Sequence, residues 1–479
     1  MRRILFATLM FPLLLAGCAV GPAYEEPQVD LPEEWPDEVL LTGEERADWS
    51  NWWHRFDDPV LNRLVERALD DNLNMQLQYQ RLQEARARLG LADAQQMPTV
   101  EGQADAARGR ESGAANPLGG GTTSNMFSVT GLLSYEVDLW GKLESQSDAA
   151  EAALQESVFT HDSVRLSTVA DVVATYTELR AAQRSLAITE RTLETREETV
   201  RIERARYEGG DTNELTLRQA VSELEATRAL VPQQRQRVAQ LKTALGVLVG
   251  MTPRELTSEL DFGEGSLSDI TLPEEVPEVL PSDLLERRPD IRAAEAAIIA
   301  ATEEVGVAQA QRLPSFNLRG SFGSAAIESD DLFTGPAETW EIGASVLGPI
   351  FDFGRNKARV EAAQSLRDQA ETQYRVTLQQ AFREVRDALA VYEATDERVS
   401  RLRDQVEALE KTLELAELRY EEGLTDFLTV QDTQRVLLDA ELTLTNAIRD
   451  RLNATATLFK AMGGGWADGK AVEPESGDS

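Results

Sequence analysis

The 479-residue sequence predicts a mainly α-helical protein with a transmembrane β-strand portion, built from two helix-strand-strand-helix halves. The first observation is a repeat: residues 206–217 and 419–430 are 213 positions apart and identical at seven of twelve positions. The second is a pair of proline-free runs of 66 residues, at 142–207 and 355–420, and the third is an alternation of apolar and polar residues before each run. Each repeated stretch is predicted to be the tip between two antiparallel helices.

The N-terminus predicts export and lipid attachment. Two arginines precede an apolar stretch at 4–15, which is too short to span a membrane and is typical of a signal peptide at 1–17. The stretch ends in Leu-Ala-Gly-Cys, which resembles a bacterial lipobox and implies cleavage before Cys18 and lipidation of Cys18. The alternative is that Cys18 is an incidental residue of an ordinary signal peptide. By resemblance to lipoprotein sorting, Ala19 and Val20 favour the outer membrane over the inner membrane.

Charge and composition exclude several classes of function. The formal net charge of −35 argues against nucleic acid as a partner, because the phosphate backbone would be repelled. No apolar run of transmembrane-helix length follows Cys18, which is the only cysteine, so a mature chain that spans a membrane must use strands. His54 and His161 belong to no metal-binding pattern, and no catalytic motif such as Gly-x-Ser-x-Gly or His-Glu-x-x-His is present. We therefore predict no enzyme, no cofactor and no metal site.

The repeat also predicts the domain organisation. The expected parts are a lipidated, extended segment at 18–58, a first repeat at 59–250, a linker at 251–282, a second repeat at 283–462 and a disordered tail at 463–479. Large aromatic side chains are expected to pin the first segment to the body of the protein, namely Trp35, Trp49, Trp52 and Trp53. A helix is expected at about 57–97, and its end at 89–100 recurs 216 positions later.

Each repeat contributes one predicted strand pair, at about 98–140 and 314–354. Apolar residues occupy every second position of 126–138: Phe127, Val129, Gly131, Leu133, Tyr135 and Val137. One apolar and one polar face are typical of a transmembrane barrel strand, and an ordinary soluble sheet packed on a core is the alternative. Four strands cannot close around a water-filled bore, and open edges are not tolerated in lipid, so several chains are expected to share one barrel.

Long helices are predicted at 142–250 and 355–462, each run turning back at its tip. Apolar residues recur at every seventh position, which indicates a coiled-coil seam that serves packing. The complementary seam positions of the second half carry Leu402, Leu409 and Ala416. Charged residues off the seam are interpreted as a solvated face, among them Arg196, Glu197 and Glu198.

Several of these motifs belong together: the lipobox, the Leu-Leu-Glu-Arg-Arg-Pro-Asp-Ile stretch at 284–291, the two Arg-Tyr-x-x-Gly tips and the Gly-Gly-Gly-Trp at 463–466. The combination resembles the outer membrane factor family, the TolC-like ducts of Gram-negative efflux systems. The lipoprotein branch that serves pumps of the resistance-nodulation-division type fits best, and the match covers nearly all of the mature chain.

The resemblance implies a homotrimer with a 12-stranded β-barrel in the outer membrane and a long periplasmic α-helical coiled-coil barrel. The implied function is passive export of drugs or other toxic solutes, together with a periplasmic adaptor and an inner membrane pump. The protein would be lipid-anchored in the outer membrane, in contact with its lipid, and would extend into the periplasm. A metal-efflux or protein-secretion duct is the alternative within transport. A non-pore periplasmic coiled-coil scaffold is the alternative outside it, although a scaffold leaves the strand pairs unexplained.

The resemblance maps a periplasmic gate onto Leu428, Asp432 and Arg435. Their spacings of four and three put the three residues on one helical face. Three leucines would form an apolar plug, three aspartates would form a ring that repels anions, and Arg435 would tether a neighbouring helix. The first half has other residues at these positions, Leu215, Gln219 and Ser222, so the carboxylate is not repeated. The alternative is that Leu428 packs in the seam and Asp432 is a solvated charge.

The resemblance also maps an adaptor contact onto the tips, at Gly210, Thr212, Gly423, Leu424 and Thr425. The first tip departs from the family's short motif, because it has Asp211 where the second has a leucine. The alternative is that the turn alone requires glycine at a tip.

Overall fold

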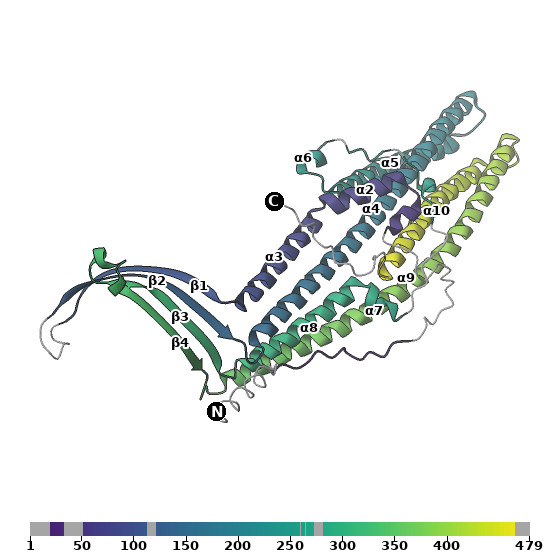
Figure 1. Ribbon diagram of the computed structural model, residues 1–479. Helices are drawn as coiled ribbons and strands as arrows, with labels where there is room; N and C mark the ends of the chain where they lie inside the picture. The colour runs from purple at the N-terminus through teal and green to yellow at the C-terminus, as the bar shows by residue number, and fades with distance from the viewer. Residues whose placement is uncertain are drawn as a thin grey trace. The chain divides into compact units, whose positions relative to one another are not determined.

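The computed structural model describes residues 20–32, 51–112, 121–258, 260–263, 265–272 and 281–464 (Figure 1). The predicted signal peptide, Cys18 and nearly all of the predicted tail lie outside these residues. The chain divides into two compact units. One consists of Met1–Val29, Arg81–Ser157 and Ala293–Arg375, and the other of Asp30–Gln80, Val158–Arg292 and Val376–Ser479. Each unit combines corresponding segments of both repeats, so a repeat of the sequence is not a spatial domain.

The strands of the first unit form one antiparallel sheet in the order β1-β2-β3-β4 (Figure 1). They are β1 (Thr99–Arg110), β2 (Thr123–Val137), β3 (Ser315–Ala326) and β4 (Glu338–Leu347). The first repeat supplies β1 and β2, the second supplies β3 and β4, and the repeats meet where β2 pairs with β3. The predicted strand pairs are confirmed, and the two hairpins join into a single sheet.

The two faces of the sheet differ in polarity, as the alternation predicts. One row of the apolar face consists of Val100, Leu133, Gly320 and Ile342. The adjacent row, on the polar face, consists of Glu101, Leu132, Ser321 and Glu341. Large apolar side chains of the first face are exposed in the single chain. Within the described ranges, the outer edges of β1 and β4 also have no strand partner.

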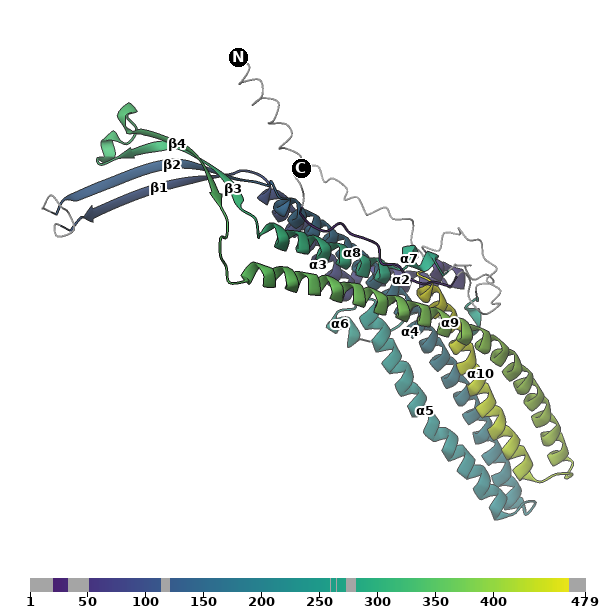
Figure 2. The same cartoon turned by 90° about the horizontal axis from the view of Figure 1, so that it is seen from below.

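Two helical hairpins carry most of the other residues. In the first repeat α4 (Lys142–Gly209) precedes α5 (Glu214–Leu248), and in the second α9 (Arg355–Glu421) precedes α10 (Phe427–Ala461) (Figure 2). The helix α4 has 68 residues and α9 has 67, which agrees with the two proline-free runs. Pro232 lies inside α5 and does not end it. The prediction of long helices that turn at the repeated stretches is confirmed.

The expected helix at 57–97 is in fact two helices, α2 (Pro59–Asp71) and α3 (Leu73–Gln95). Between them Asn72 has an extended backbone, with ψ of 125°. Its side-chain oxygen accepts hydrogen bonds from the backbone N–H groups of Asn74 and Met75 over 2.8 and 3.2 Å, as an N-cap does. The one-helix expectation is wrong because asparagine competes with the helical hydrogen bonds in this way.

The other elements are shorter, and none of the helices in the described ranges is apolar over a length that would cross a membrane. These elements are η2 (Trp52–Phe56), α6 (Pro253–Leu256), η3 (Leu267–Asp269), α7 (Asp283–Arg287), α8 (Pro289–Ala310), η4 (Ser329–Asp331) and η5 (Gly335–Ala337).

The break at Asn72 has a counterpart 216 residues later, where Arg288 separates α7 from α8. The Asn72 amide donates to the carbonyl oxygen of Leu248 over 2.8 Å, and the Arg288 guanidinium donates to that of Ala461 over 2.9 Å. Leu248 and Ala461 are the last residues of α5 and α10. At both breaks, therefore, a side chain donates a hydrogen bond to the carbonyl of the last residue of α5 or α10, which has no partner within its own helix.

The hydrophobic core of the second unit includes tryptophans of the predicted N-terminal segment. Trp52 stacks on Phe459 with ring centroids 5.3 Å apart, and Trp53 is buried in the same core. The expectation that tryptophans pin the segment is confirmed for these two, although they lie in the short helix η2 rather than in extended chain. The other two lie outside the described residues, Trp35 and Trp49.

Candidate functional site

The predicted functional residues lie at two tips whose turns are closed by the same hydrogen bonds. In the first tip the Gly210 N–H donates to the carbonyl of Tyr207 over 3.1 Å, and the Asp211 N–H donates to that of Arg206 over 2.8 Å. Both bonds recur 213 residues later, over 3.0 and 2.8 Å. This pair of bonds is a Schellman motif, which requires a positive φ, and Gly210 and Gly423 supply +83° and +69°. No atom lies within 4 Å of a Cβ placed at either glycine, so the turn and not crowding requires glycine.

The return helix of each tip begins with a capping side chain. Asn213 accepts a hydrogen bond from the Thr216 N–H over 3.1 Å, and Asp426 accepts one from the Thr429 N–H over 3.1 Å. The Thr429 hydroxyl also donates to Asp426 over 2.8 Å, and these bonds hold the pKa of Asp426 below its ordinary value. An ionised carboxylate at this position also interacts favourably with the helix dipole. Both tips are therefore well-defined turns.

The residues predicted to contact an adaptor lie on the outside of these turns. Gly210, Gly423 and Leu424 are exposed, whereas Thr212 and Thr425 are half-buried. Leu424 is the large apolar side chain of this group, and 68% of it is exposed. The two glycines are required by the turn itself and need no binding partner. The exposed side chain of Leu424, in contrast, has no role in the turn of the single chain.

The residues of the predicted gate lie on one exposed face of α10. Leu428 is 48% exposed, whereas Phe427 and Val430 are buried, so Leu428 is not a seam residue in the single chain. Nη2 of Arg435 lies 3.4 Å from Oδ1 of Asp432, and both side chains are exposed. Arg435 thus pairs within its own helix here rather than with a neighbouring helix. A pair this long and this exposed contributes little to stability.

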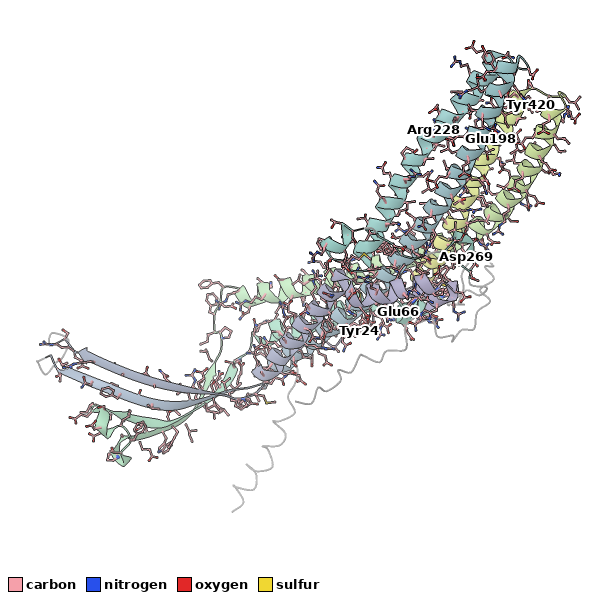
Figure 3. All side chains as sticks on the ribbon, turned by 90° about the horizontal axis from the view of Figure 1, so that it is seen from above. Tyr24, Glu66, Glu198, Arg228, Asp269 and Tyr420 are labelled. Atoms are coloured by element: carbon pink, nitrogen blue, oxygen red, sulfur yellow. The ribbon has the colours of Figure 1, made fainter. Side chains whose placement is uncertain are left out.

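A cluster that sequence reasoning missed joins the two hairpins near the tips. Glu203 of α4 is 2% exposed, and its Oε1 accepts hydrogen bonds from the Tyr420 hydroxyl over 3.0 Å and from Arg206 over 3.2 Å. The Arg206 guanidinium lies over the Tyr420 ring, 5.2 Å from its centroid. Figure 3 shows Tyr420 close to the end of its hairpin. Glu203, Arg206 and Tyr420 are called the tip cluster below.

Apolar packing surrounds the tip cluster. The Tyr420 ring lies 5.3 Å from that of Phe427, which is buried with Val200, Ala220 and Leu224. Burial, followed by the charge of Glu203, raises the pKa of the Tyr420 hydroxyl, so the hydroxyl is protonated at neutral pH and donates to the carboxylate. The other carboxylate oxygen of Glu203 is buried and has no hydrogen-bond partner in the described part of the chain. The buried charge therefore depends on Tyr420 and Arg206.

The seam of the first repeat contains the signal for this cluster. At three seam positions the first repeat has polar residues where the second has apolar ones: Thr189, Arg196 and Glu203 against Leu402, Leu409 and Ala416. The three polar residues are buried. Arg196 donates to the carbonyl and to the carboxylate of Glu223, each over 2.7 Å. The interpretation of Arg196 as part of a solvated face is therefore wrong, because the residue lies in the seam with its charge paired to α5.

The arrangement at the tips supports packing and charge rather than a reaction. The described residues include no group of three or more His, Cys, Asp or Glu side chains that could hold a metal ion. Three carboxylates near the second tip have different environments, since Glu203 is buried, Asp426 caps a helix and Asp432 is exposed. Asp432 is thus the exposed carboxylate within the predicted gate.

Known proteins resemble this chain over nearly its whole length. A model of the family described as outer membrane efflux protein matches residues 64–251 and 280–464, one stretch in each repeat. The solvent efflux pump outer membrane protein SrpC of Pseudomonas putida is 32% identical over 468 residues, covering 96% of this chain and 98% of SrpC. The Campylobacter jejuni CmeC outer membrane channel has a TM-score of 0.88 at 26% identity, covering 94% of this chain and 95% of CmeC. The open state of the Neisseria gonorrhoeae MtrE outer membrane channel has a TM-score of 0.84 at 30% identity, covering 94% and 98%.

We expect Tyr420→Phe to loosen the tips, because the buried carboxylate of Glu203 loses one of its two donors. At a partly exposed site such a hydrogen bond contributes about 1 kcal/mol, so local opening should become about fivefold more frequent. Hydrogen–deuterium exchange of the backbone amides at 196–224 and 416–435 measures how often the tips open. Tyr207→Phe is the matched control, because Tyr207 has the equivalent position in the first tip and is exposed. Equal exchange in the two variants would contradict the role of the tip cluster.

Proposed function

The chain belongs to the outer membrane efflux protein family, and on this premise we propose that three copies form a duct through which toxic solutes leave the cell. The protein is an outer membrane efflux channel component and not an enzyme. As a component of an efflux pump system it has two kinds of partner, an adaptor and an inner membrane pump. Passive conduction needs a continuous pore, and a four-stranded sheet with two free edges does not enclose one.

The observation that carries the proposal is the two-faced sheet, whose two edges have no strand partner among the residues that the structure describes. The apolar face suits lipid and the polar face suits water, as in the wall of a transmembrane barrel. A free edge is not tolerated in lipid, because its N–H and C=O groups find no partner there. At each edge a strand of a neighbouring copy can satisfy these groups, and three copies supply the twelve strands that the resemblance to TolC-like ducts implies.

The same three copies supply six tips for the contact with the adaptor. We infer that the second tip offers the more apolar contact, because Leu424 is exposed there. The first tip has the acidic Asp211 at the corresponding position. An adaptor that engages all six tips therefore meets two unequal surfaces in alternation.

We propose that the gate lies on α10, where Leu428 and Asp432 share an exposed face. In a trimer, three Leu428 side chains form an apolar constriction and three Asp432 carboxylates form a ring that repels anions. Arg435 reaches Asp432 of its own helix in the single chain, at 3.4 Å. In the closed trimer we propose that Arg435 instead tethers a neighbouring helix, which leaves the carboxylate ring with its charge.

Lipidation of Cys18 gives the duct a second attachment to the membrane in this proposal. The first residue that the structure describes is Val20, two positions after Cys18, and its N–H donates to the carbonyl of Trp140 over 3.3 Å. Trp140 closely follows the end of β2 at Val137. The segment that follows the lipid thus begins at the junction between strand and helix, within reach of the inner leaflet of the outer membrane.

The proposed cargo is small toxic organic solutes, because SrpC is named for solvent efflux. Deleting the gene should therefore sensitise the cell to solvents, antibiotics and bile salts, and the intact gene in trans should restore resistance. Growth inhibition against a panel that also contains copper and silver measures the effect. Sensitivity confined to copper and silver would favour the metal-efflux duct instead.

Asp432→Ala should leave the trimer assembled but make cells severalfold more sensitive to large antibiotics such as vancomycin. The substitution removes the carboxylate ring and leaves a smaller, uncharged side chain at the constriction, so the closed mouth becomes wider for large solutes. Antibiotic uptake is measured in cells without the pump, at equal trimer levels. Gln219→Ala is the matched control, at the corresponding position of the first tip. Unchanged uptake in Asp432→Ala would assign Asp432 to a solvated charge.

The parent protein should incorporate radiolabelled palmitate, and Cys18→Ala should not. The variant should nevertheless reach the outer membrane and form trimers, because strands supply far more apolar contact than one lipid anchor. Membrane fractionation and native gels measure both properties. A parent protein without label would refute lipidation, whereas an unlabelled variant that stays in the periplasm would show that the anchor directs assembly.

A further inference from the structure

The two β-hairpins of the sheet are equivalent pair by pair. For the residues of β1 from Thr99 to Arg108, adding 216 to the residue and 213 to its partner in β2 gives a pair of β3 and β4, so that Thr99↔Ser134 corresponds to Ser315↔Leu347. The same offsets relate the flanking helices, 216 between the starts of α3 and α8 and 213 between those of α4 and α9. The repeat therefore includes the hydrogen-bond register and not only the sequence.

The junction of β2 and β3 shows how one repeat docks on the next. A residue that follows β2 contacts the residue that precedes β3: Nε1 of Trp140 donates to the carbonyl of Pro314 over 2.7 Å. The Trp140 ring also lies 6.4 Å from the ring of Phe316. All three residues are partly buried. The junction thus consists of a strand ladder and, at its base, an aromatic seat formed by these three residues.

The equivalent residues at the two free edges of the sheet are exposed. Phe353 corresponds to Trp140 and is 90% exposed. Val100 corresponds to Phe316 and is 76% exposed. Ile350, beside the first of these, is fully exposed as well. Both sides of a second junction are therefore present in the chain, one at each edge, and one chain cannot bring its own two edges together with four strands.

Given the edge pairing of the proposed trimer, we propose that β4 of one copy meets β1 of the next in the register of β2 and β3, and that Phe353 occupies a seat formed by Pro98 and Val100 of that copy. The inference rests on the proposed trimer and adds the residues that meet in it. Its occupant is a second copy of this chain, because the chain itself contains the template for the contact. The contact is heterologous, so no strand edge is free once the ring of copies closes.

The register follows from the repeat. Leu132 pairs with Ser321 within the chain. Adding 213 to the first number and subtracting 216 from the second gives the equivalent pair between copies, Ser345 opposite Asp105 of the next copy. Both of these residues lie on the polar face of the sheet, as their partners Asn317 and Ser128 do. The neighbouring pair is apolar, with Val346 opposite Ala104 of the next copy. A shift by one residue would set polar side chains against apolar ones, so the face pattern supports the same register.

The seat between copies differs from the seat within the chain in one respect. Phenylalanine has no N–H group, so the carbonyl of Pro98 gains no hydrogen bond of the kind that Pro314 accepts from Trp140. The contact between copies therefore depends on apolar surface. Phe351 adds to that surface, with its ring centroid 4.4 Å from that of Phe353 in an edge-to-face arrangement.

Disulfide crosslinking tests the register. The full-length double variant Ser345→Cys with Asp105→Cys, oxidised in isolated outer membranes, should give covalent dimers and trimers on non-reducing gels. Opposed Cβ atoms in an antiparallel pair lie about 4.5–5.5 Å apart, which a disulfide can span with little adjustment. Leu132→Cys with Ser321→Cys is the matched control, because this equivalent pair lies within one chain and should form a disulfide that joins no copies. Each single variant and the parent, whose only cysteine is Cys18, give the background.

Two outcomes would overturn the inference, and they differ in what else they overturn. Efficient crosslinking of Ser345→Cys with Gln103→Cys, two residues away on the same face, in place of Asp105→Cys would refute the register and leave the trimer intact. A protein that sediments as a monomer in detergent and yields no covalent dimer from either pair would refute the register and the proposed trimer together.

Phe353→Ser tests the aromatic seat between copies. The variant should lower the temperature at which the trimer dissociates and reduce the crosslinking yield of Ser345→Cys with Asp105→Cys. Phe333→Ser is the matched control, because Phe333 is 82% exposed and lies in the connection between β3 and β4, away from the seat. Equal dissociation temperatures for the two variants would refute the seat, while the crosslinks decide on the register independently.

Discussion

Backbone N–H and C=O groups at a strand edge in lipid can form hydrogen bonds only with another strand. In this chain the requirement falls on β1 and β4, the outer strands of its sheet. In the proposed trimer, insertion into the membrane and assembly of the copies are therefore coupled, because both depend on pairing these edges. Each strand is also connected at one end to a helix, namely α3, α4, α8 and α9. In the proposed trimer, closing the ring of strands therefore also brings together the helices that are connected to them.

The duplication is retained where geometry must repeat and is lost where the two hairpins take different roles. Both tips close with the same Schellman bonds, and both return helices end on a carbonyl satisfied by a distant side chain. The seams differ, because Arg196 and Glu203 are buried polar residues of the first repeat alone. Their hydrogen bonds specify particular partners, whereas apolar packing tolerates sliding. The proposed gate lies on the second hairpin, whose seam has apolar residues at the corresponding positions, Leu409 and Ala416.

Most of the fold could be predicted from periodicity, and the site only in part. Alternation and heptads report which face of an element is buried, so the strands and the long hairpins were predictable. The break at Asn72 depends on one side chain that caps α3 and also reaches the carbonyl of Leu248, and apolar periodicity reports neither contact. Glu203 resembles a surface glutamate until its seam position is compared with Ala416. The family resemblance maps the predicted gate onto Asp432 and Arg435, but their pairing within one helix is a matter of side-chain geometry.

The two offsets of the repeat differ by three residues, and the difference arises between the strands of a hairpin. Between equivalent ladder pairs, the chain from β3 to β4 is three residues shorter than that from β1 to β2, yet the two ladders keep one register. A change of length at this turn leaves the strand register unchanged, because it moves no side chain from the polar to the apolar face. Evolution and engineering can therefore lengthen, shorten or replace these turns, for instance to display an epitope, while the lining of the pore stays the same.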